Sequence, residues 1–576
     1  MKLFTTSLLF LLHALPGQSW SAQQESNLSM CRNIPGSAGY PSAATWEAFN
    51  ASISGRLIRV VPSAKFCASL PGGACTDAQW TSALFRGTIP GAMDSVNWEQ
   101  GYDLNPPSLC LRNATTCGQG DVPIYSVEAE TAADIQAALK FASKHNLRLA
   151  VKSSGHDLLG RSTAPNSFLI RTSNFQNISF TDAFFVGSKN MGSAVTIGSG
   201  VPTNTLFQHG KANGKIMVAA GAATVCPAGG YVQGAGHSTL SPKLGLAADN
   251  ALEFTIVVAS GEELRVNAVS HPDLFYALRG GGAGSWGVIV SATFRTYPTF
   301  NATSSTILLT AANSTVAGAL ASIHAEHIFD WDSVHASQFF AFSKNSVAGG
   351  SDASILFLLA TVMPQTTVER SKTLLAPFMN ASLALPGVSL VSQAFQSSNI
   401  NDASFMADDA AGSNGVLGSR LIPEATYRDS PQKVGPVYKK LFDGGAAAID
   451  GVMVAGGKVA ENANISSAVH PAWRTAKTHI ILPNGWADSA SLAEIRTLRR
   501  RFQTVQLPLL EELSGLNAGS YSNEADVLEP HFQTTFFGEN YAKLSAIKKR
   551  YDPGDLFIVG AGVGSDRWDE WGICKV

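Results

Sequence analysis

The sequence has little net charge and few charged residues. Its 41 Lys and Arg nearly balance its 43 Asp and Glu, which gives a net charge of -2, and charged residues make up 15% of the 576 positions. A chain without basic or acidic bias has no strong electrostatic attraction to nucleic acid or to an anionic membrane surface. We therefore expect no nucleic-acid partner, and small-molecule chemistry becomes the first hypothesis.

Long apolar runs are also missing. No stretch reaches the ~20 apolar residues that a helix needs to span a bilayer, so we expect no membrane partner. The short apolar run Leu8–Leu15 follows an early lysine and precedes small residues where a signal peptidase can cut. This arrangement predicts a secretion signal over residues 1–21 rather than an anchor. Eight Asn-x-Ser/Thr sites agree with a secreted glycoprotein: Asn27, Asn50, Asn113, Asn177, Asn301, Asn313, Asn380 and Asn464.

Cysteine is scarce, with seven residues. In an oxidising compartment six of them can pair. Short spacing predicts two local disulfides and leaves a third to join the chain ends: Cys67–Cys75, Cys110–Cys117 and Cys31–Cys574. The seventh, Cys226, lies in an Ala/Gly-rich stretch, and we predict a buried free thiol.

Short motifs for metal catalysis, hydrolysis or nicotinamide binding are absent. The 12 histidines show no H-E-x-x-H or other close ligand spacing, and no G-x-S-x-G stands between a strand and a helix. Gly282, Gly284 and Gly287 form a literal G-x-G-x-x-G. This motif follows a predicted helix and leads into a strand, whereas a dinucleotide-binding fingerprint follows a strand and opens a helix. We predict no metal site, no hydrolase and no nicotinamide cofactor.

From Asp121 onward the sequence predicts a strand-helix-strand unit. VPIYSVEA is typical of a strand, and TAADIQAALKFASKHN of a helix in which Thr131 and Asp134 form a capping box. LRLAVK returns as a strand, and the polar loop SSGHDLLGRST follows at its carboxyl end. Ligands bind at such ends in open α/β sheets, so His156 in this loop is a candidate site residue.

A second loop, Gly221–Ser238, is rich in Gly and Ala, and a hairpin with its turn at Ser260–Gly261 follows it. Two glycine-rich loops that leave separate strands can bring backbone N–H groups against a pyrophosphate, because successive amides form anion-binding nests. Asp249 and Asn250, after the second loop, are predicted to bind a ribose or nucleotide edge.

Four stretches then identify a family: SSGHDLLGRS, GGYVQGAGHSTLSPKLGLAADN, LRGGGAGSWGVI and NYAKLSAIKKRYDPGDLF. In order and approximate spacing they resemble the berberine-bridge-enzyme-like flavoprotein oxidases of the vanillyl-alcohol-oxidase superfamily, secreted fungal members above all. The resemblance implies an α+β, PCMH-type FAD-binding fold of two subdomains. It also implies an inserted substrate domain with an antiparallel sheet, and a C-terminal segment that completes the FAD domain.

The resemblance divides the chain into five parts. They are a signal peptide at 1–21, an N-terminal extension at 22–117, the FAD-binding domain at 118–299, the substrate domain at 300–504 and the returning C-terminal segment at 505–576. The implied function is FAD-dependent oxidation of a small-molecule alcohol, sugar or secondary metabolite by a secreted monomer, with O2 as acceptor. Two alternatives stay open: a flavin-loaded binding or allergen-like protein with little turnover, and a dehydrogenase that uses another acceptor.

The resemblance also assigns the flavin attachment. His156 matches the histidine that carries the flavin through its 8α-methyl group. Many relatives add a second bond from a cysteine, but that position is Ala222 here, so we predict a single bond. Val225 matches the residue that governs oxygen access, and its small branched side chain favours an oxidase. Leu158 replaces an aromatic residue of the alkaloid enzymes, which weakens any transfer of their substrate.

For the catalytic base, the segment YSNEAD offers Tyr521 and Glu524, with Asp526 as a third candidate, because hydride removal from an alcohol or amine needs a proton acceptor. Asn540 and Tyr541 resemble a family pair beside the flavin ring. His237 is predicted to shape its loop. The remaining predicted cofactor contacts are Ser153, Ser154, Gly155, Asp157, Gly160, Gly230, Gly236 and Val288.

Overall fold

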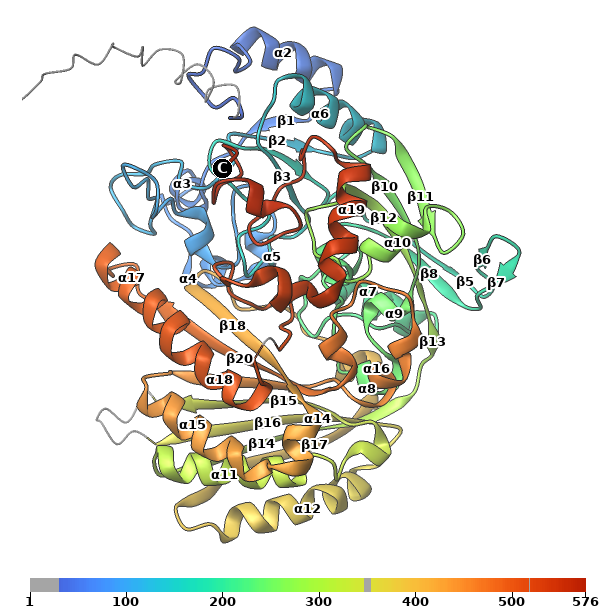
Figure 1. The fold of residues 1–576 in the computed structure, drawn as a ribbon, viewed down its shortest axis with the longest axis vertical. Helices are drawn as coiled ribbons and strands as arrows, with labels where there is room; N and C mark the ends of the chain where they lie inside the picture. The colour runs from blue at the N-terminus through green and yellow to red at the C-terminus, as the bar shows by residue number, and fades with distance from the viewer. Residues whose placement is uncertain (1–30, 346–353, 517) are drawn as a thin grey trace, which may run out of the picture.

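The computed structural model describes residues 31–345, 354–516 and 518–576. The predicted signal peptide at 1–21 lies outside these ranges. Figure 1 shows an upper unit, built from the first half of the chain and the C-terminal segment, above a lower unit with a large sheet and its covering helices. In the described part, no helix is both long and apolar enough to cross a membrane.

The first layer of the upper unit is a four-stranded sheet in the order β1-β2-β4-β3. Its strands are β1 (Leu57–Arg59), β2 (Tyr125–Glu128), β3 (Leu149–Lys152) and β4 (Phe168–Arg171). Strands β2, β4 and β3 run parallel. The predicted helix is α6 (Ala132–Lys144), and Thr131 and Asp134 form its capping box. Its apolar face packs, together with Trp46 of α2 (Ala43–Ser52), over this sheet.

The second layer is a five-stranded antiparallel sheet in the order β11-β10-β12-β8-β5. Its strands are β5 (Ile178–Thr181), β8 (Ala194–Gly198), β10 (Ala251–Val257), β11 (Glu263–Asn267) and β12 (Val288–Arg295). Strands β10 and β11 form the predicted hairpin. Helices α7 (Thr203–Ala212) and α10 (Pro272–Ala277) belong to the same layer.

The lower unit contains a seven-stranded antiparallel sheet in the order β17-β14-β16-β15-β19-β20-β18. Its strands are β14 (Asn301–Ala311), β15 (Ser337–Lys344), β16 (Ile355–Pro364), β17 (Val388–Asn399), β18 (Asn414–Pro423), β19 (Ala448–Met453) and β20 (Ala476–Trp486). Helices α11 (Ser314–His327), α12 (Val368–Ala384) and α15 (Val434–Asp443) cover one face (Figure 1). The expected antiparallel sheet is confirmed.

The Gly-, Ala- and Asp-rich stretch between Asn399 and Ser419 is partly regular. A short helix, α13 (Ile400–Ala403), opens it, and β18 already begins at Asn414. Strand β18 forms because it pairs with β20 along its whole length. Only residues 404–413 remain a loop, and this shorter segment reaches the upper unit.

The C-terminal segment returns to the upper unit, but only after residues 507–514, which still pack in the core of the lower unit. After α17 (Leu492–Arg501) and α18 (Leu507–Ser514), helix α19 (Tyr541–Tyr551) packs beside α10 (Figure 1). Leu544 and Ile547 of α19 share one apolar core with Trp286.

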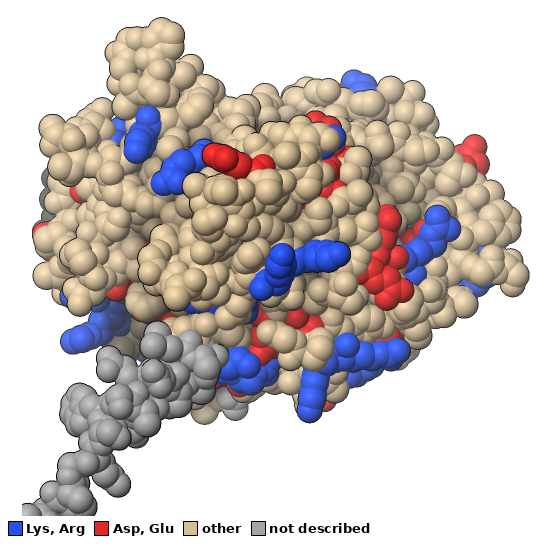
Figure 2. Space-filling model, turned by 90° about the horizontal axis from the view of Figure 1, so that it is seen from above, with Lys and Arg blue, Asp and Glu red and all other residues tan. Residues whose placement is uncertain are grey.

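The structure confirms the three predicted disulfides and the buried free thiol of Cys226. The face in Figure 2 shows basic and acidic side chains interspersed on a mostly uncharged surface. No broad patch of one charge is visible on this face.

Candidate active site

A cavity of about 670 Å³ lies where the two units meet. Most of its walls come from four parts of the chain: the loop after β3, the segment Ala220–His237, the lower sheet with the loop that follows α13, and the C-terminal residues Tyr521–Glu524. Thr172, Ser199 and residues of the stretch 283–289 complete the lining. On the side of the lower unit, the cavity is closed by the apolar side chains of Phe339, Ala360 and Val362 from the lower sheet. Mainly apolar walls with a few convergent polar groups are typical of a small-molecule site.

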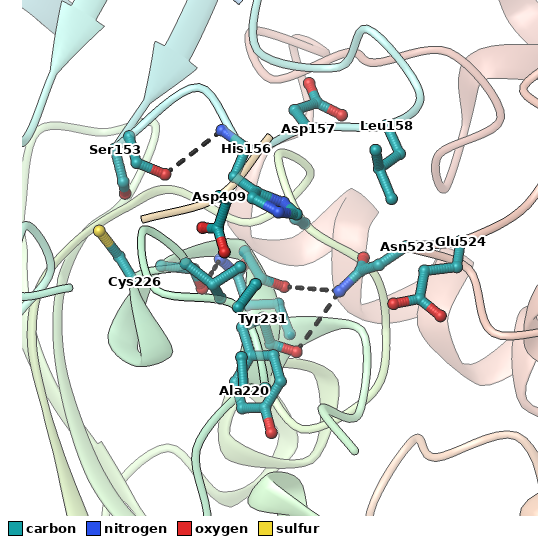
Figure 3. Close-up of a pocket in the computed structure, with 18 of the residues that line it drawn as sticks. Ser153, His156, Asp157, Leu158, Ala220, Cys226, Tyr231, Asp409, Asn523 and Glu524 are labelled. Carbon is teal, nitrogen blue, oxygen red and sulfur yellow. Dashed lines mark hydrogen bonds between the residues drawn. The ribbon is translucent and has the colours of Figure 1, made fainter. Parts of the chain in front are cut away.

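The loop after β3 places His156 in this cavity. Figure 3 shows its imidazole pointing inward, between Asp409 and Asn523. The loop is closed by Asp157, whose carboxylate accepts hydrogen bonds from Leu159 N at 3.0 Å and from Ser162 N at 2.6 Å. Because the backbone beside His156 is fixed in this way, its ring is held at the cavity wall.

Asp94, in the N-terminal extension, lies behind the same loop. Its backbone N–H donates to the carbonyl of Gly155 at 3.2 Å. Its side chain is buried, and among the described residues its Oδ2 has no hydrogen-bond partner. Burial raises the pKa of Asp94 to about 6, although the nearby charge of His156 acts in the opposite direction. No sequence motif points to this residue.

The opposite wall is held by Asp409, from the loop 404–413. Its carboxylate accepts hydrogen bonds from Ala223 N at 2.8 Å and from Thr224 N and Oγ1 at 2.7 Å each. These bonds fix the backbone that carries Val225 and Cys226, and both of these residues line the cavity. Burial raises the pKa of the Cys226 thiol to about 12, so this thiol is a poor nucleophile.

Asn523 joins the C-terminal segment to the glycine-rich loop. Its Nδ2 donates to the carbonyls of Gly230 at 3.2 Å and Tyr231 at 3.5 Å (Figure 3), and to the hydroxyl of Tyr521 at 3.0 Å. The Tyr521–Glu524 stretch is therefore anchored to the wall that faces His156.

Glu524 lies between two histidines. Nε2 of His237 is 3.3 Å from Oε1 and 3.2 Å from Oε2 of the carboxylate, and Nδ1 of His479 is 3.3 Å from Oε2. Burial alone raises a carboxyl pKa, but the two imidazoles outweigh it and hold the pKa of Glu524 well below its usual range. Figure 3 shows the carboxylate turned into the cavity.

Tyr521 has the opposite electrostatic environment. Burial, and then the charge of Glu524, raise the pKa of its phenol well above the ordinary value. The phenol therefore keeps its proton at neutral pH, whereas Glu524 is ionised. Of the two predicted bases, only Glu524 is unprotonated at neutral pH in the resting site.

Comparisons with known proteins agree with this geometry. A family model described as an FAD binding domain matches residues 123–267, and a model described as berberine and berberine like matches residues 520–564. An FAD-linked oxidoreductase of Arthroderma benhamiae is 35% identical over 95% of this chain and 96% of its own length. The FAD-linked oxidoreductase easE of Trichophyton verrucosum is 34% identical over 98% of this chain and 95% of its own.

Solved structures show the same fold over nearly the whole chain. The VAO-type flavoproteins MtVAO615 and MtVAO713 of Myceliophthora thermophila C1 have TM-scores of 0.83 and 0.84, at 29% and 27% identity. Each comparison covers 95% of this chain and 100% of the other. The chain belongs to the VAO-type FAD-linked oxidoreductases. Berberine bridge enzyme from Eschscholzia californica, at 15% identity and a TM-score of 0.59 over 77% of this chain and 90% of its own, shares the fold.

The cavity of this oxidoreductase fits FAD. Glycines let backbone segments come close around it: a Cβ on Gly229 would lie 2.7 Å from Ser153 Oγ, and one on Gly284 2.6 Å from Val559. Two residues of its lining, Ser199 and Gln233, have a buried side-chain oxygen without a partner among the described residues. An unpaired buried polar group costs about 1–3 kcal/mol, so a polar ligand would stabilise this wall.

Eight of the predicted cofactor contacts line the cavity: Ser153, Ser154, Gly155, His156, Asp157, Val225, Gly230 and His237. Both predicted bases, Tyr521 and Glu524, line it as well. His237 does more than shape its loop, because its ring borders the cavity and contacts Glu524.

Asp249 and Asn250 are not among the residues that line this cavity. The buried carboxylate of Asp249 binds Arg474 at 2.7 Å. The side chain of Asn250 bonds to the Leu244 and Leu246 carbonyls and to Tyr297. Both residues bind neighbouring parts of the protein, and their predicted contact with a ribose or nucleotide edge stays a prediction.

Asn540 and Tyr541 also lie outside the cavity lining. Asn540 accepts a hydrogen bond from the Tyr276 hydroxyl at 2.7 Å, and Tyr541 donates to Asp566 at 2.8 Å. Neither borders the cavity, because both belong to the packing at the start of α19.

Val288, Gly160 and Gly236 are not among the residues that line the cavity. Side chains alternate along a strand, so β12 turns Ile289 to the cavity and Val288 to the core on the other side. Gly160 and Gly236 have positive φ angles of 71° and 69°. A Cβ on Gly160 would lie 2.5 Å from the ring of Trp98, so these glycines allow close packing behind the cavity wall.

Proposed function

We propose that this flavoprotein is a secreted oxidase of a small-molecule alcohol, sugar or secondary metabolite. The observation that carries the proposal is the position of Glu524, an ionised carboxylate in the same cavity as His156. FAD, when bound, supplies the hydride acceptor. The protein's own part is to bind the substrate against the apolar side chains of the lower sheet and to accept its proton.

In this proposal Glu524 accepts the hydroxyl or amine proton of the substrate. His237 contacts both carboxylate oxygens and holds the group in place, and His237 and His479 together keep it unprotonated before a substrate binds. General-base catalysis typically contributes about 10²–10⁴-fold to the rate. The protonated phenol of Tyr521, which borders the same cavity, can donate a hydrogen bond to the substrate oxygen.

We also propose that His156 carries FAD through a single covalent bond. The support is the ring's position at the cavity wall (Figure 3) and the methyl side chain of Ala222, which cannot form a thioether. The chemical consequence is retention of the cofactor by an enzyme that works outside the cell. Three disulfides favour an oxidising compartment.

The experiment that tests the function is a screen of alcohols, sugars and amines that monitors peroxide release. A substrate that bleaches the flavin under anaerobic conditions, followed by rapid reoxidation with O2, is the expected result. Reoxidation no faster than that of free flavin would instead identify a dehydrogenase. If no compound of these classes bleaches the flavin, the alternative of a flavin-loaded binding protein with little turnover gains support.

A further inference from the structure

We propose that His237, His479 and Glu524 together bind one divalent transition-metal ion, for which Zn²⁺ is the probe. The three residues come from the glycine-rich loop, from strand β20 and from the C-terminal segment. In the sequence they are far apart, so a search for close ligand spacing does not detect them. In the structure their ligand atoms all lie within 4.8 Å of one another.

The distances suit a tetrahedral ion. Zn²⁺ holds imidazole nitrogen and carboxylate oxygen at about 2.0–2.2 Å, which puts neighbouring ligand atoms about 3.3–3.6 Å apart. Here Oε2 of Glu524 is 3.2 Å from Nε2 of His237 and 3.3 Å from Nδ1 of His479. Two of the three distances between ligand atoms therefore match a tetrahedral ion. A small rotation of the His237 ring toward His479 shortens the third.

His479 supplies an independent observation. Its side chain is completely buried on β20, and among the described residues neither of its ring nitrogens makes a hydrogen bond of acceptable geometry. A buried polar group without such a bond is costly, and a metal ion would satisfy the nitrogen that faces Glu524. Since His237 and Glu524 border the cavity, the fourth position of the ion is open to water or substrate.

The donor set predicts the selectivity. Imidazole nitrogens suit Zn²⁺, Co²⁺, Ni²⁺ and Cu²⁺, whereas Mg²⁺ and Ca²⁺ require oxygen ligands. An ion on Glu524 also occupies the lone pair that would accept the substrate proton. Zn²⁺ should therefore inhibit flavin reduction reversibly, and this consequence, unlike the binding itself, rests on the proposed role of Glu524.

Calorimetric titration of Zn²⁺ into the chelator-treated, flavin-loaded full-length protein tests the binding. We expect one site that Mg²⁺ does not fill, and an affinity at least tenfold weaker in His479→Gln and in Glu524→Gln. The matched control is His209→Gln, which removes an exposed imidazole on α7 and should bind Zn²⁺ like the wild type. Glu524 faces the cavity, so its variant tests the site even if His479→Gln fails to fold.

Equal Zn²⁺ affinity in the wild type and in Glu524→Gln would overturn the metal site. If binding depends on the cluster but Zn²⁺ leaves the anaerobic rate of flavin reduction unchanged, the metal site stands and the proposed role of Glu524 as base is contradicted. The two proposals can therefore fail separately.

Discussion

Glu524 is the residue whose replacement tests the proposed proton transfer most directly. Glu524→Gln removes the ionised acceptor but keeps the size of the side chain, so flavin reduction by substrate should slow by about 10²–10⁴-fold, with flavin content unchanged. Tyr521→Phe should slow it far less, because the raised pKa keeps the phenol protonated. Anaerobic stopped-flow absorbance measures both rates. If neither variant slows reduction tenfold, the base lies elsewhere, in the lower unit.

His156 determines how FAD is retained. His156→Ala should still bind FAD, because the rest of the cavity wall is unchanged, but it should release the flavin on acid precipitation. The wild-type pellet should stay yellow. Cys226 cannot replace the lost bond, since its buried thiol has a pKa raised to about 12 and thiolate is the reactive form. Peptide mass mapping provides the check, and a flavinylated Cys226 peptide or an unmodified His156 peptide from fully yellow enzyme would refute the single bond.

Asp94 gives a pH-dependent prediction. Burial raises its pKa from 3.8 to about 6, so the folded state binds more protons than the unfolded state between these values. The stability that this group contributes is present below its unfolded pKa and is lost as the pH rises through about 6. At 1.36 kcal/mol per pKa unit the loss is at most about 3 kcal/mol.

Asp94→Asn removes this titration without changing the side-chain size. The melting temperature of the variant minus that of the wild type should be larger at pH 7.5 than at pH 4.5. Thermal unfolding at the two pH values measures the difference. A difference that does not change with pH would show that Asp94 does not titrate in this range.

At the scale of single elements, most of the upper unit could be predicted from the sequence. The capping box fixes the start of α6 and the Ser260–Gly261 turn fixes the hairpin, because both depend on local chemistry. The loop after β3 was predictable for the same reason, since its site residues are contiguous. Asp94, Asp409 and His479 were not predictable, because each reaches the cavity from a distant segment through tertiary packing.

The loop 404–413 is the element whose role emerges only from the structure. Asp409 holds Ala223 and Thr224, while the adjacent Asp408 holds the N-terminal extension through Ser82 Oγ and Leu84 N. The two neighbouring carboxylates thus fix two different partners. This division supplies a matched pair of variants.

Asp409→Ala should loosen the backbone that carries Val225, because the charge-assisted hydrogen bonds to Ala223 and Thr224 are lost. Amide hydrogen exchange of the Ala223–Val225 peptide should accelerate at least tenfold. Asp408→Ala should accelerate exchange near Ser82 and leave Ala223–Val225 at the wild-type rate. Hydrogen exchange with mass spectrometry measures both, and equal effects of the two variants on Ala223–Val225 would contradict the assignment.

At the scale of the whole molecule, the cavity depends on segments from the whole length of the chain. The resemblance predicted that the C-terminal segment returns to the upper unit, and the packing of α19 on α10 confirms it. Apolar pattern alone could not place Asn540 and Tyr541, because their partners, Tyr276 and Asp566, come from other elements. The cavity is a product of the tertiary fold, because residues as far apart in the sequence as Val151 and Glu524 line it.

The Cys31–Cys574 disulfide should stabilise the fold without holding the cavity together. It joins residues 543 positions apart, and next to it Arg32 donates hydrogen bonds to the carbonyls of Gly572 at 3.0 Å and Leu147 at 3.2 Å. A disulfide that closes a long loop typically contributes about 2–5 kcal/mol.

The double variant Cys31→Ser with Cys574→Ser should therefore lower the melting temperature and speed thermal inactivation. Its flavin content at 25 °C should stay at the wild-type level, because Tyr521–Glu524 are anchored by Asn523 and not by the chain ends. Flavin content and thermal unfolding of the purified variant measure the two effects. Loss of flavin at 25 °C would show that the chain ends hold the cavity together directly.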